Sequence, residues 1–246
     1  MKAAPEVQKR LLDLAELDAA LDRLAHRRRT LPELAEIDEQ SKRYARHATE
    51  VIEAETEAGD LAREQTKAEA DVDTVRIRIE RNQQRLDSGA VSSARDLASL
   101  QSEITSLHKR QSDLEEVVLE IMERREAADA RVTDLIARRD EARATLTEAE
   151  ARRDAAFAEI DKEAGEVRSR RAAVAAELPA DLLKLYERLR EQYGVGAAML
   201  QAGRCQGCKV ALSIAEMNQI KAAAPDEVLR CEECRRILVR TAESGL

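Results

Sequence analysis

Apolar residues recur at steps of three and four positions over long stretches of this chain. Between Leu97 and Val174 the two steps alternate strictly, which is the a/d spacing of a heptad repeat. The pattern lasts for about eleven repeats, long enough to identify a coiled coil, and its period of about 3.5 residues predicts a left-handed supercoil. The positions predicted to face a partner helix are Leu97, Leu100, Ile104, Leu107, Gln111, Leu114, Val118, Ile121, Arg125, Ala128, Val132, Leu135, Arg139, Ala142, Leu146, Ala149, Arg153, Ala156, Ile160, Glu163, Val167, Arg170 and Val174.

The preceding part of the chain carries the same spacing in two sets that do not share a phase. The first set ends at Ala58 and the second begins at Leu61, so we expect a local phase change of the coiled coil near Gly59. The sets are Leu34, Ile37, Tyr44, Ala48, Val51 and Ala58, then Leu61, Ala68, Val72, Val75, Ile79 and Leu86.

Few residues interrupt these patterns. "RTLPELAEI" places Thr30 before Pro32 and predicts a helix start, which leaves a short first helix over residues 5–29. The Gly/Ser-rich stretch at Ser88-Gly89 is the next interruption, and Pro179 ends the helical region. Two long helices joined by a turn near 87–94 predict an antiparallel hairpin, because each then buries its apolar seam on the other. An extended rod that dimerises through the same seam is the alternative.

The composition argues against a large globular core. The chain of 246 residues has no Trp, one Phe and three Tyr, and 37% of its residues are charged. Aromatic side chains supply much of the buried area of ordinary cores, whereas abundant charge with scarce Gly and Pro is typical of long helices. The net charge of −8 argues against binding of nucleic acid or an anionic membrane by the whole chain. The N-terminal residues lack the apolar run of a signal peptide and no stretch approaches a membrane span, so we expect a cytoplasmic protein.

All four cysteines lie in two CxxC pairs, within "RCQGCKVALS" and "LRCEECRRILV". A CxxC turn points two thiolates at one centre, and two such turns complete the tetrahedron that Zn²⁺ prefers, with sulfurs at about 2.3 Å. A redox pair is the alternative in a reducing compartment, but it belongs to a βαβ unit, which the sequence does not predict. Four cysteines also leave no open position for a catalytic water. We therefore predict one structural zinc per chain, bound by Cys205, Cys208, Cys231 and Cys234.

The remaining C-terminal segments complete the predicted organisation. Ser213 and Glu216 form a capping box that opens a short helix, so the gap between the cysteine pairs holds a folded insert. Before the first pair, one helical face is apolar and predicts a docking helix; it carries Leu182, Tyr186, Leu189 and Tyr193. The predicted fold is mainly α: a long antiparallel coiled-coil helical hairpin with a short N-terminal helix (1–178), a connecting docking helix (179–196) and a small C4 zinc ribbon with a helical insert (197–246).

Several stretches resemble one known family, the bacterial coiled-coil proteins with a C-terminal four-cysteine zinc ribbon, formerly a domain of unknown function. They are "SSARDLASLQSEITSLHKRQSDLEEVVLEIMER", "LPADLLKLYERLR", "GRCQGCKVALSIAEMNQI" and "VLRCEECRRILVR". The resemblance covers nearly the whole chain, and the last three stretches are its specific part. It implies an elongated hairpin with the ribbon at its open end and zinc on the four cysteines. It also implies a chaperone or adaptor, since members with that role have been linked to flagellar assembly, type III secretion and the enhancer-dependent sigma factor. In one lineage the family has been linked to messenger-RNA binding instead.

Two functions remain once an enzyme is set aside. The sequence shows no Gly-rich phosphate loop, no nucleophile with a matched base and no open metal site, so we expect no catalytic residues. We favour a non-enzymatic adaptor or chaperone-like protein that binds protein partners and is a monomer or a weak dimer. The alternative is a regulator that binds RNA or DNA through the zinc ribbon.

The charge of the ribbon bears on that alternative. Residues 196–246 hold seven Lys/Arg against six Asp/Glu, and zinc on four thiolates adds about −2, so little charge is left to neutralise phosphate. The stretch also contains no aromatic side chain on which a base could stack. The basic side chains predicted to contact nucleic acid or a partner are Arg204, Lys209, Arg230, Arg235, Arg236 and Arg240.

Overall fold

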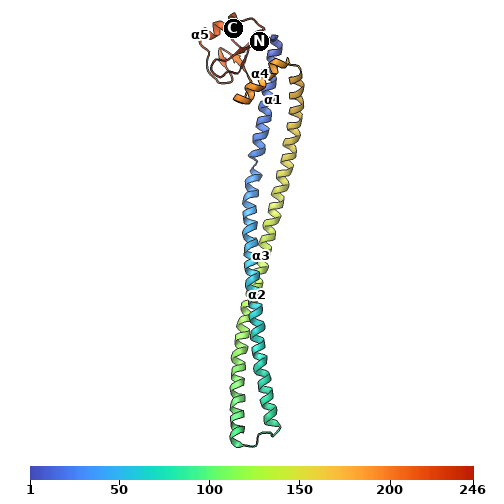
Figure 1. The fold of residues 1–246 in the computed structure, drawn as a ribbon, viewed down its shortest axis with the longest axis vertical. Helices are drawn as coiled ribbons and strands as arrows, with labels where there is room; N and C mark the ends of the chain where they lie inside the picture. The colour runs from blue at the N-terminus through green and yellow to red at the C-terminus, as the bar shows by residue number, and fades with distance from the viewer. The chain divides into compact units, whose positions relative to one another are not determined.

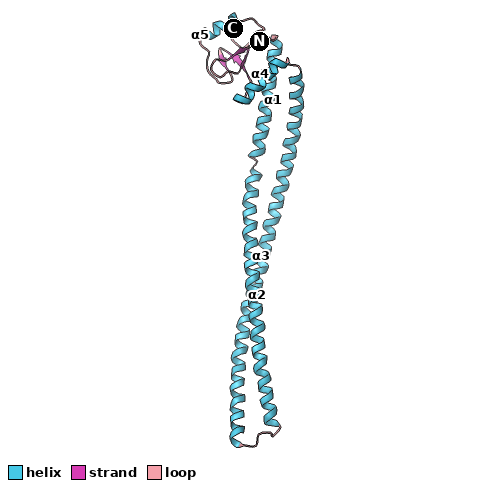
Figure 2. Ribbon diagram, in the orientation of Figure 1, coloured by secondary structure: helices cyan, strands magenta, loops and turns pink.

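The computed structural model describes residues 1–246 and confirms a mainly helical fold with a small sheet (Figure 1, Figure 2). The chain divides into two compact units. Unit 1 comprises Met1–Leu34 and Ala151–Leu246, and unit 2 comprises Ala35–Glu150. The elements are α1 (Pro5–Arg29), α2 (Pro32–Asp87), α3 (Ala94–Ala176), α4 (Ala180–Tyr193), β1 (Ala197–Gln201), β2 (Arg204–Cys205), α5 (Ile214–Ala222), β3 (Leu229–Arg230) and β4 (Ile237–Val239). None of the helices combines the length and the hydropathy needed to cross a membrane.

Unit 2 is an antiparallel pair formed by α2 and α3, joined by the turn at residues 88–93 (Figure 1). Gly89 takes a φ of 68° in this turn. Interhelical contacts lie at positions that move backwards along α3 as they move forwards along α2. They include Tyr44 with Arg143, Glu57 with Arg131, Glu64 with Arg124 and Arg78 with Glu103. The predicted hairpin is confirmed.

The seam of α2 is more regular than the sequence suggested. Its inward-facing positions follow alternating steps of three and four residues with no phase change at Gly59, so the predicted change is wrong. They are Val51, Ala54, Ala58, Leu61, Gln65, Ala68, Val72, Val75, Ile79, Asn82 and Leu86. Val51 and Ala58 of the first apolar set lie in the same row as Val72, Ile79 and Leu86 of the second, at multiples of seven residues, so the two sets belong to a single seam. The predicted sets passed over buried Ala54 as well as the polar members Gln65 and Asn82, and these omissions hid the continuity of the seam.

The seam of α3 follows the prediction as far as Ile160. Beyond it Val167 and Val174 still face inward as predicted, but the row between them moves by one position. Ala164 is buried and Arg171 is half-buried, whereas the predicted Glu163 and Arg170 are exposed, so these two assignments are wrong. A straight α-helix drifts against a heptad repeat. In unit 1 this end of α3 also packs against α1 and α4, so a strict two-helix seam does not persist there.

Three arginines occupy predicted seam positions in α3: Arg125, Arg139 and Arg153. All are half-buried. Their guanidinium groups reach polar partners rather than an apolar core, at Gln65, Asp140 and Asp154 respectively. This arrangement supports the expectation that each stem lies along the seam while the charged head stays solvated.

The core of unit 1 joins helices to the sheet. The apolar face predicted for the docking helix lies on α4, where Leu182, Tyr186 and Leu189 are buried. This face packs into one cluster with α1, the end of α3, β1 and β4. The fully buried members from the other elements include Leu11, Leu14 and Ile237. Unit 1 therefore includes helical segments as well as the zinc ribbon.

The small sheet has the strand order β2-β1-β4-β3. β1 pairs antiparallel with β2 and parallel with β4, and β3 pairs antiparallel with β4. The first residues of the chain pair with the segment just before β3. The Ala3 N–H donates to the Asp226 carbonyl at 2.7 Å, and the Val228 N–H donates to the Met1 carbonyl at 3.1 Å. Buried Gln8 donates to the Ala3 carbonyl at 2.8 Å and fixes this segment onto α1.

A buried ionic cluster ties three helices of unit 1 together. Asp18 of α1 has a side chain that is only 4% exposed and accepts the Tyr186 hydroxyl of α4 at 2.7 Å. It also contacts the guanidinium groups of Arg171 from α3 at 2.5 Å and Arg190 from α4 at 3.1 Å. Hydrogen bonding to Asp18 raises the pKa of Arg171, while burial and then the same carboxylate raise the pKa of Tyr186. Sequence reasoning missed this cluster because its members are distant along the chain.

Replacing Gly196 with alanine is expected to lower the free energy of unfolding of unit 1 by about 2–3 kcal/mol, because the added carbon would overpack the site. A Cβ there would lie 2.6 Å from both the ring and the backbone oxygen of Tyr186. Urea denaturation should detect the loss. Gly165→Ala is the matched control: it lies inside α3 with no atom near the new carbon, so it should stabilise the protein by about 1 kcal/mol. Equal effects of the two changes would contradict the proposed clash.

Candidate metal centre

The first CxxC pair forms a tight knuckle at the end of β2. Cys205 ends the strand; its N–H donates to the Val210 carbonyl at 3.0 Å, and its carbonyl accepts the Lys209 N–H at 2.8 Å. The turn requires Lys209 at a φ of 63°, a left-handed conformation uncommon for residues other than glycine. The Arg204 guanidinium donates to the Lys209 carbonyl at 2.9 Å and supports this residue.

The second pair repeats this construction after β3. The Cys231 N–H donates to the Arg236 carbonyl at 3.0 Å, and the Cys231 carbonyl accepts the Arg235 N–H at 2.9 Å. Arg235 has a φ of 61°, and the Arg230 guanidinium donates to its carbonyl at 2.9 Å. In both knuckles, the arginine before the first cysteine therefore holds the left-handed residue that follows the second cysteine.

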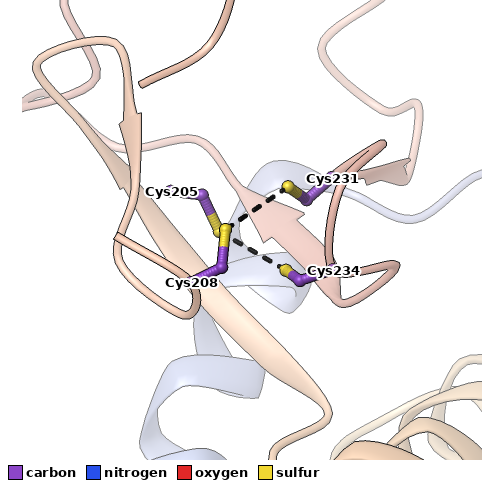
Figure 3. Close-up of side chains that lie close together, drawn as sticks. All are labelled: Cys205, Cys208, Cys231 and Cys234. Atoms are coloured by element: carbon purple, nitrogen blue, oxygen red, sulfur yellow. Dashed lines mark hydrogen bonds between the residues drawn. The ribbon is translucent and has the colours of Figure 1, made fainter. Parts of the chain in front are cut away.

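The two knuckles bring four sulfur atoms to one point (Figure 3). All four Sγ atoms lie within 4.8 Å of one another. The distance from Cys205 to Cys234 is 3.8 Å, and that from Cys208 to Cys231 is 3.9 Å. A tetrahedron with zinc–sulfur bonds of about 2.3 Å has sulfur–sulfur edges of about 3.8 Å. The donor set therefore fits one structural zinc ion, as the sequence predicted.

Protons compete with zinc for these sulfurs. In the metal-free site, burial raises the pKa of Cys205 and raises that of Cys231 to about 12. Burial also acts on Cys234, but hydrogen bonds from the Arg236 backbone N–H and from the neighbouring thiols lower its pKa to about 7. Zinc must therefore displace protons from Cys205 and Cys231, so its apparent affinity falls as the pH falls.

The segment between the knuckles is folded, as predicted. The Ser213 hydroxyl accepts the Glu216 N–H at 3.1 Å, and the Glu216 carboxylate accepts the Ser213 N–H at 2.7 Å. This capping box opens α5, whose Ile220 packs into the cluster that also contains Cys205 and Cys231. The apolar cover keeps water away from part of the metal centre. Four thiolates complete the coordination, so the zinc serves folding and leaves no open position.

The six basic residues predicted to contact nucleic acid or a partner have different surroundings in the structure. Arg204 and Arg230 support the knuckles, as described. Arg236 donates to the Tyr193 and Val195 carbonyls, and Arg240 donates to a group of carbonyls from Ile220 to Glu227. Lys209 donates to Gln206 at 2.8 Å, and no hydrogen bond or ion pair holds the Arg235 side chain. Their contact with nucleic acid or a partner stays a prediction, but four of the six have structural roles.

Comparisons with known proteins agree with this architecture. The sequence profile of the CT398-like coiled-coil hairpin domain matches residues 14–194, and that of the C4-type zinc ribbon domain matches residues 204–238. The uncharacterized protein Rv2229c of Mycobacterium tuberculosis (strain H37Rv) is 40% identical over 240 residues, covering 98% of both chains.

Solved structures show the same fold. A structure from Mycobacterium smegmatis superposes with a TM-score of 0.88 at 37% identity, covering 98% of this chain and 100% of that chain. CT398 from Chlamydia trachomatis superposes with a TM-score of 0.68 at 20% identity, over 96% of this chain and 98% of that one, a likeness of fold. The hairpin profile covers well over half of the sequence, and the two mycobacterial proteins named above each match 98% of this chain. The chain therefore belongs to the family of CT398-like coiled-coil hairpin proteins that carry a C4-type zinc ribbon.

Proposed function

We propose that this protein is a non-enzymatic, cytoplasmic adaptor or chaperone-like protein that binds protein partners through the hairpin of unit 2. The observation that carries the proposal is the sequence VVLEIM at residues 117–122 of α3, which is apolar on more than one face. Val118 and Ile121 lie on the seam, whereas Leu119 is 60% exposed and Met122 is 45% exposed. A two-helix hairpin covers only one face of each helix, so the second apolar face of this stretch, with Leu119 and Met122, is left uncovered.

An open hollow next to Val118 and Leu119 suits a protein ligand. Val72 of α2 and Val118 and Leu119 of α3 line an open hollow of about 430 Å³ between the helices. Its rim carries carboxylates, including Glu69 and Glu115. Exposed apolar surface rimmed by charge is typical of protein-binding sites. The closed zinc site also supports a non-enzymatic role, because it has no position for substrate or water.

The contacts of the ribbon weigh against the alternative function, nucleic-acid binding through the ribbon. Arg204, Arg230, Arg236 and Arg240 already donate to backbone carbonyls of the same unit. Contacts to phosphate would compete with those hydrogen bonds. Since affinity for nucleic acid depends on free positive charge, these contacts support the protein-binding proposal.

A photo-crosslinking amino acid at Leu119 or Met122 is expected to yield discrete protein adducts in the host cell. The double change Leu119→Ser/Met122→Ser should lower crosslinking from a neighbouring reporter position by about tenfold, because it removes apolar contact area, while leaving thermal unfolding nearly unchanged. Positions Glu116 and Glu123, exposed on the same helix, serve as matched controls. Adducts from the control positions in equal yield, or adducts that disappear after nuclease treatment, would refute the proposal.

A further inference from the structure

A second hollow lies in unit 2 close to the hairpin turn, and we call it the turn-side hollow. Its volume is about 610 Å³. Six of its residues come from α2 and one from α3: Thr74, Ile77, Arg78, Arg81, Asn82, Arg85 and Glu103. Arg78, Arg81 and Arg85 follow one another at spacings of three and four residues, so they share one face of α2. The hollow is therefore lined by three guanidinium groups over about 10 Å of helix.

The arginines of this face lack the partners that other arginines of the hairpin have. Elsewhere in unit 2, Arg63 pairs with Asp60 and Arg138 pairs with Asp134, each one helical turn away. Within the turn-side hollow the charged residues at such spacings are other arginines, and like charges one turn apart destabilise a helix. Only Arg78 has a carboxylate, at 2.8 Å from Glu103. These like charges lie near the C-terminal end of α2, and a bound anion would offset their repulsion.

A buried amide independently points to an absent acceptor. Asn82 occupies a seam position, is 5% exposed and lines the turn-side hollow. Its Nδ2 is buried and has no hydrogen-bond partner. A buried donor without an acceptor is costly, and almost all such groups in folded proteins are satisfied. A polar seam residue can fix the register of a coiled coil, but an unpartnered one gains nothing in that role.

We propose that the turn-side hollow binds phosphate groups. Guanidinium groups present forked N–H donors that match phosphate oxygens, and Asn82, a lining residue, has an amide that lacks the acceptor a phosphate oxygen would supply. The Glu103 carboxylate opposes an anion, yet its ion pair with Arg78 offsets that charge and orients the guanidinium. The hollow is larger than one phosphate, so the ligand carries several: a free polyphosphate, or successive phosphates of a nucleic-acid backbone. The site is separate from the ribbon and does not depend on the adaptor role.

Binding isotherms of the full-length, zinc-loaded protein test this site with two probes, inorganic tripolyphosphate and a fluorescent single-stranded oligothymidylate. Arg81→Ala/Arg85→Ala should weaken binding by about tenfold or more, since charge-assisted hydrogen bonds are lost. For the oligonucleotide, the slope of log affinity against log salt should fall by about 1 to 1.5. Asn82→Leu should weaken binding about fivefold without loss of helicity.

The control removes the same charge from the same unit: Arg63→Ala/Arg138→Ala should change affinity less than twofold. Binding of both probes identifies phosphate itself as the ligand, and binding of the oligonucleotide alone identifies the backbone as its source. The proposal is overturned if neither probe binds at low salt, if the control weakens binding equally, or if Asn82→Leu binds like the wild type. A polyglutamate peptide that binds more tightly than both probes would also overturn the assignment to phosphate.

Discussion

The change Asp18→Ala is expected to destabilise unit 1 by about 3–5 kcal/mol, because removing one partner of a buried ion pair leaves the others uncompensated. Asp18 is the common acceptor for Tyr186, Arg171 and Arg190, which come from two helices. Without its carboxylate, the Tyr186 hydroxyl would keep no acceptor in a fully buried position. Urea denaturation, followed through hydrogen exchange of the α4 amides, measures the loss.

Asp22→Ala is the matched control for this prediction. Asp22 lies one turn further along α1 and contacts Arg190 at 3.7 Å, but its side chain is 65% exposed. An exposed pair contributes about 0–1 kcal/mol, so the control should change stability little. Asp18→Asn should fall between the two, since it retains an acceptor for Tyr186 without the charge. A loss below about 1 kcal/mol for Asp18→Ala would show that the cluster does not hold the three helices together.

The double change Cys205→Ser/Cys208→Ser is expected to abolish zinc binding and unfold the zinc ribbon while most helical circular dichroism persists. Structural zinc contributes about 10–16 kcal/mol of apparent binding free energy in small zinc domains, far more than their apolar cores supply. The part of the α2–α3 seam that lies in unit 2 includes no residue of the ribbon, so it does not require the metal. Metal analysis and peptide-level hydrogen exchange should show a rise in exchange over residues 204–240.

Gln206→Ala is the control, because it lies in the same knuckle and its side chain bonds only to Lys209. It should retain one zinc per chain. A chelator should reproduce the effect of the double change in the wild type, and added zinc should reverse it. Protection of residues 204–240 that persists without metal would contradict a structural role for zinc, as would a collapse of the whole helical signal.

The sequence alone determined the parts of this protein whose cause is local. Heptad spacing, the Gly/Ser interruption and Pro179 act through neighbouring residues, so the helices and the hairpin were predictable. The metal centre was predictable for the same reason, because each CxxC pair sets its geometry within four consecutive residues. The capping box of Ser213 and Glu216 also lies within four consecutive residues. The seam errors had two sources. The predicted seam of α2 passed over buried Ala54 and polar Gln65. The predicted seam of α3 missed the shift to Ala164, where α1 and α4 also pack against this end of the helix.

Only the tertiary structure decided which polar groups meet across the chain. Asp18 and Arg171 look like ordinary helix-surface residues in the sequence, and the apolar face that carries Tyr186 does not reveal what its hydroxyl meets, until the packing of α1, α3 and α4 brings the three side chains together. The same holds for Arg236 and Arg240, whose donors satisfy carbonyls of distant segments rather than facing outward. The environment of a side chain depends on contacts with residues that are distant in the sequence, and the sequence does not show which residues those are. The spacing of residues along a helix fixes which face they share, and only the fold fixes what that face meets.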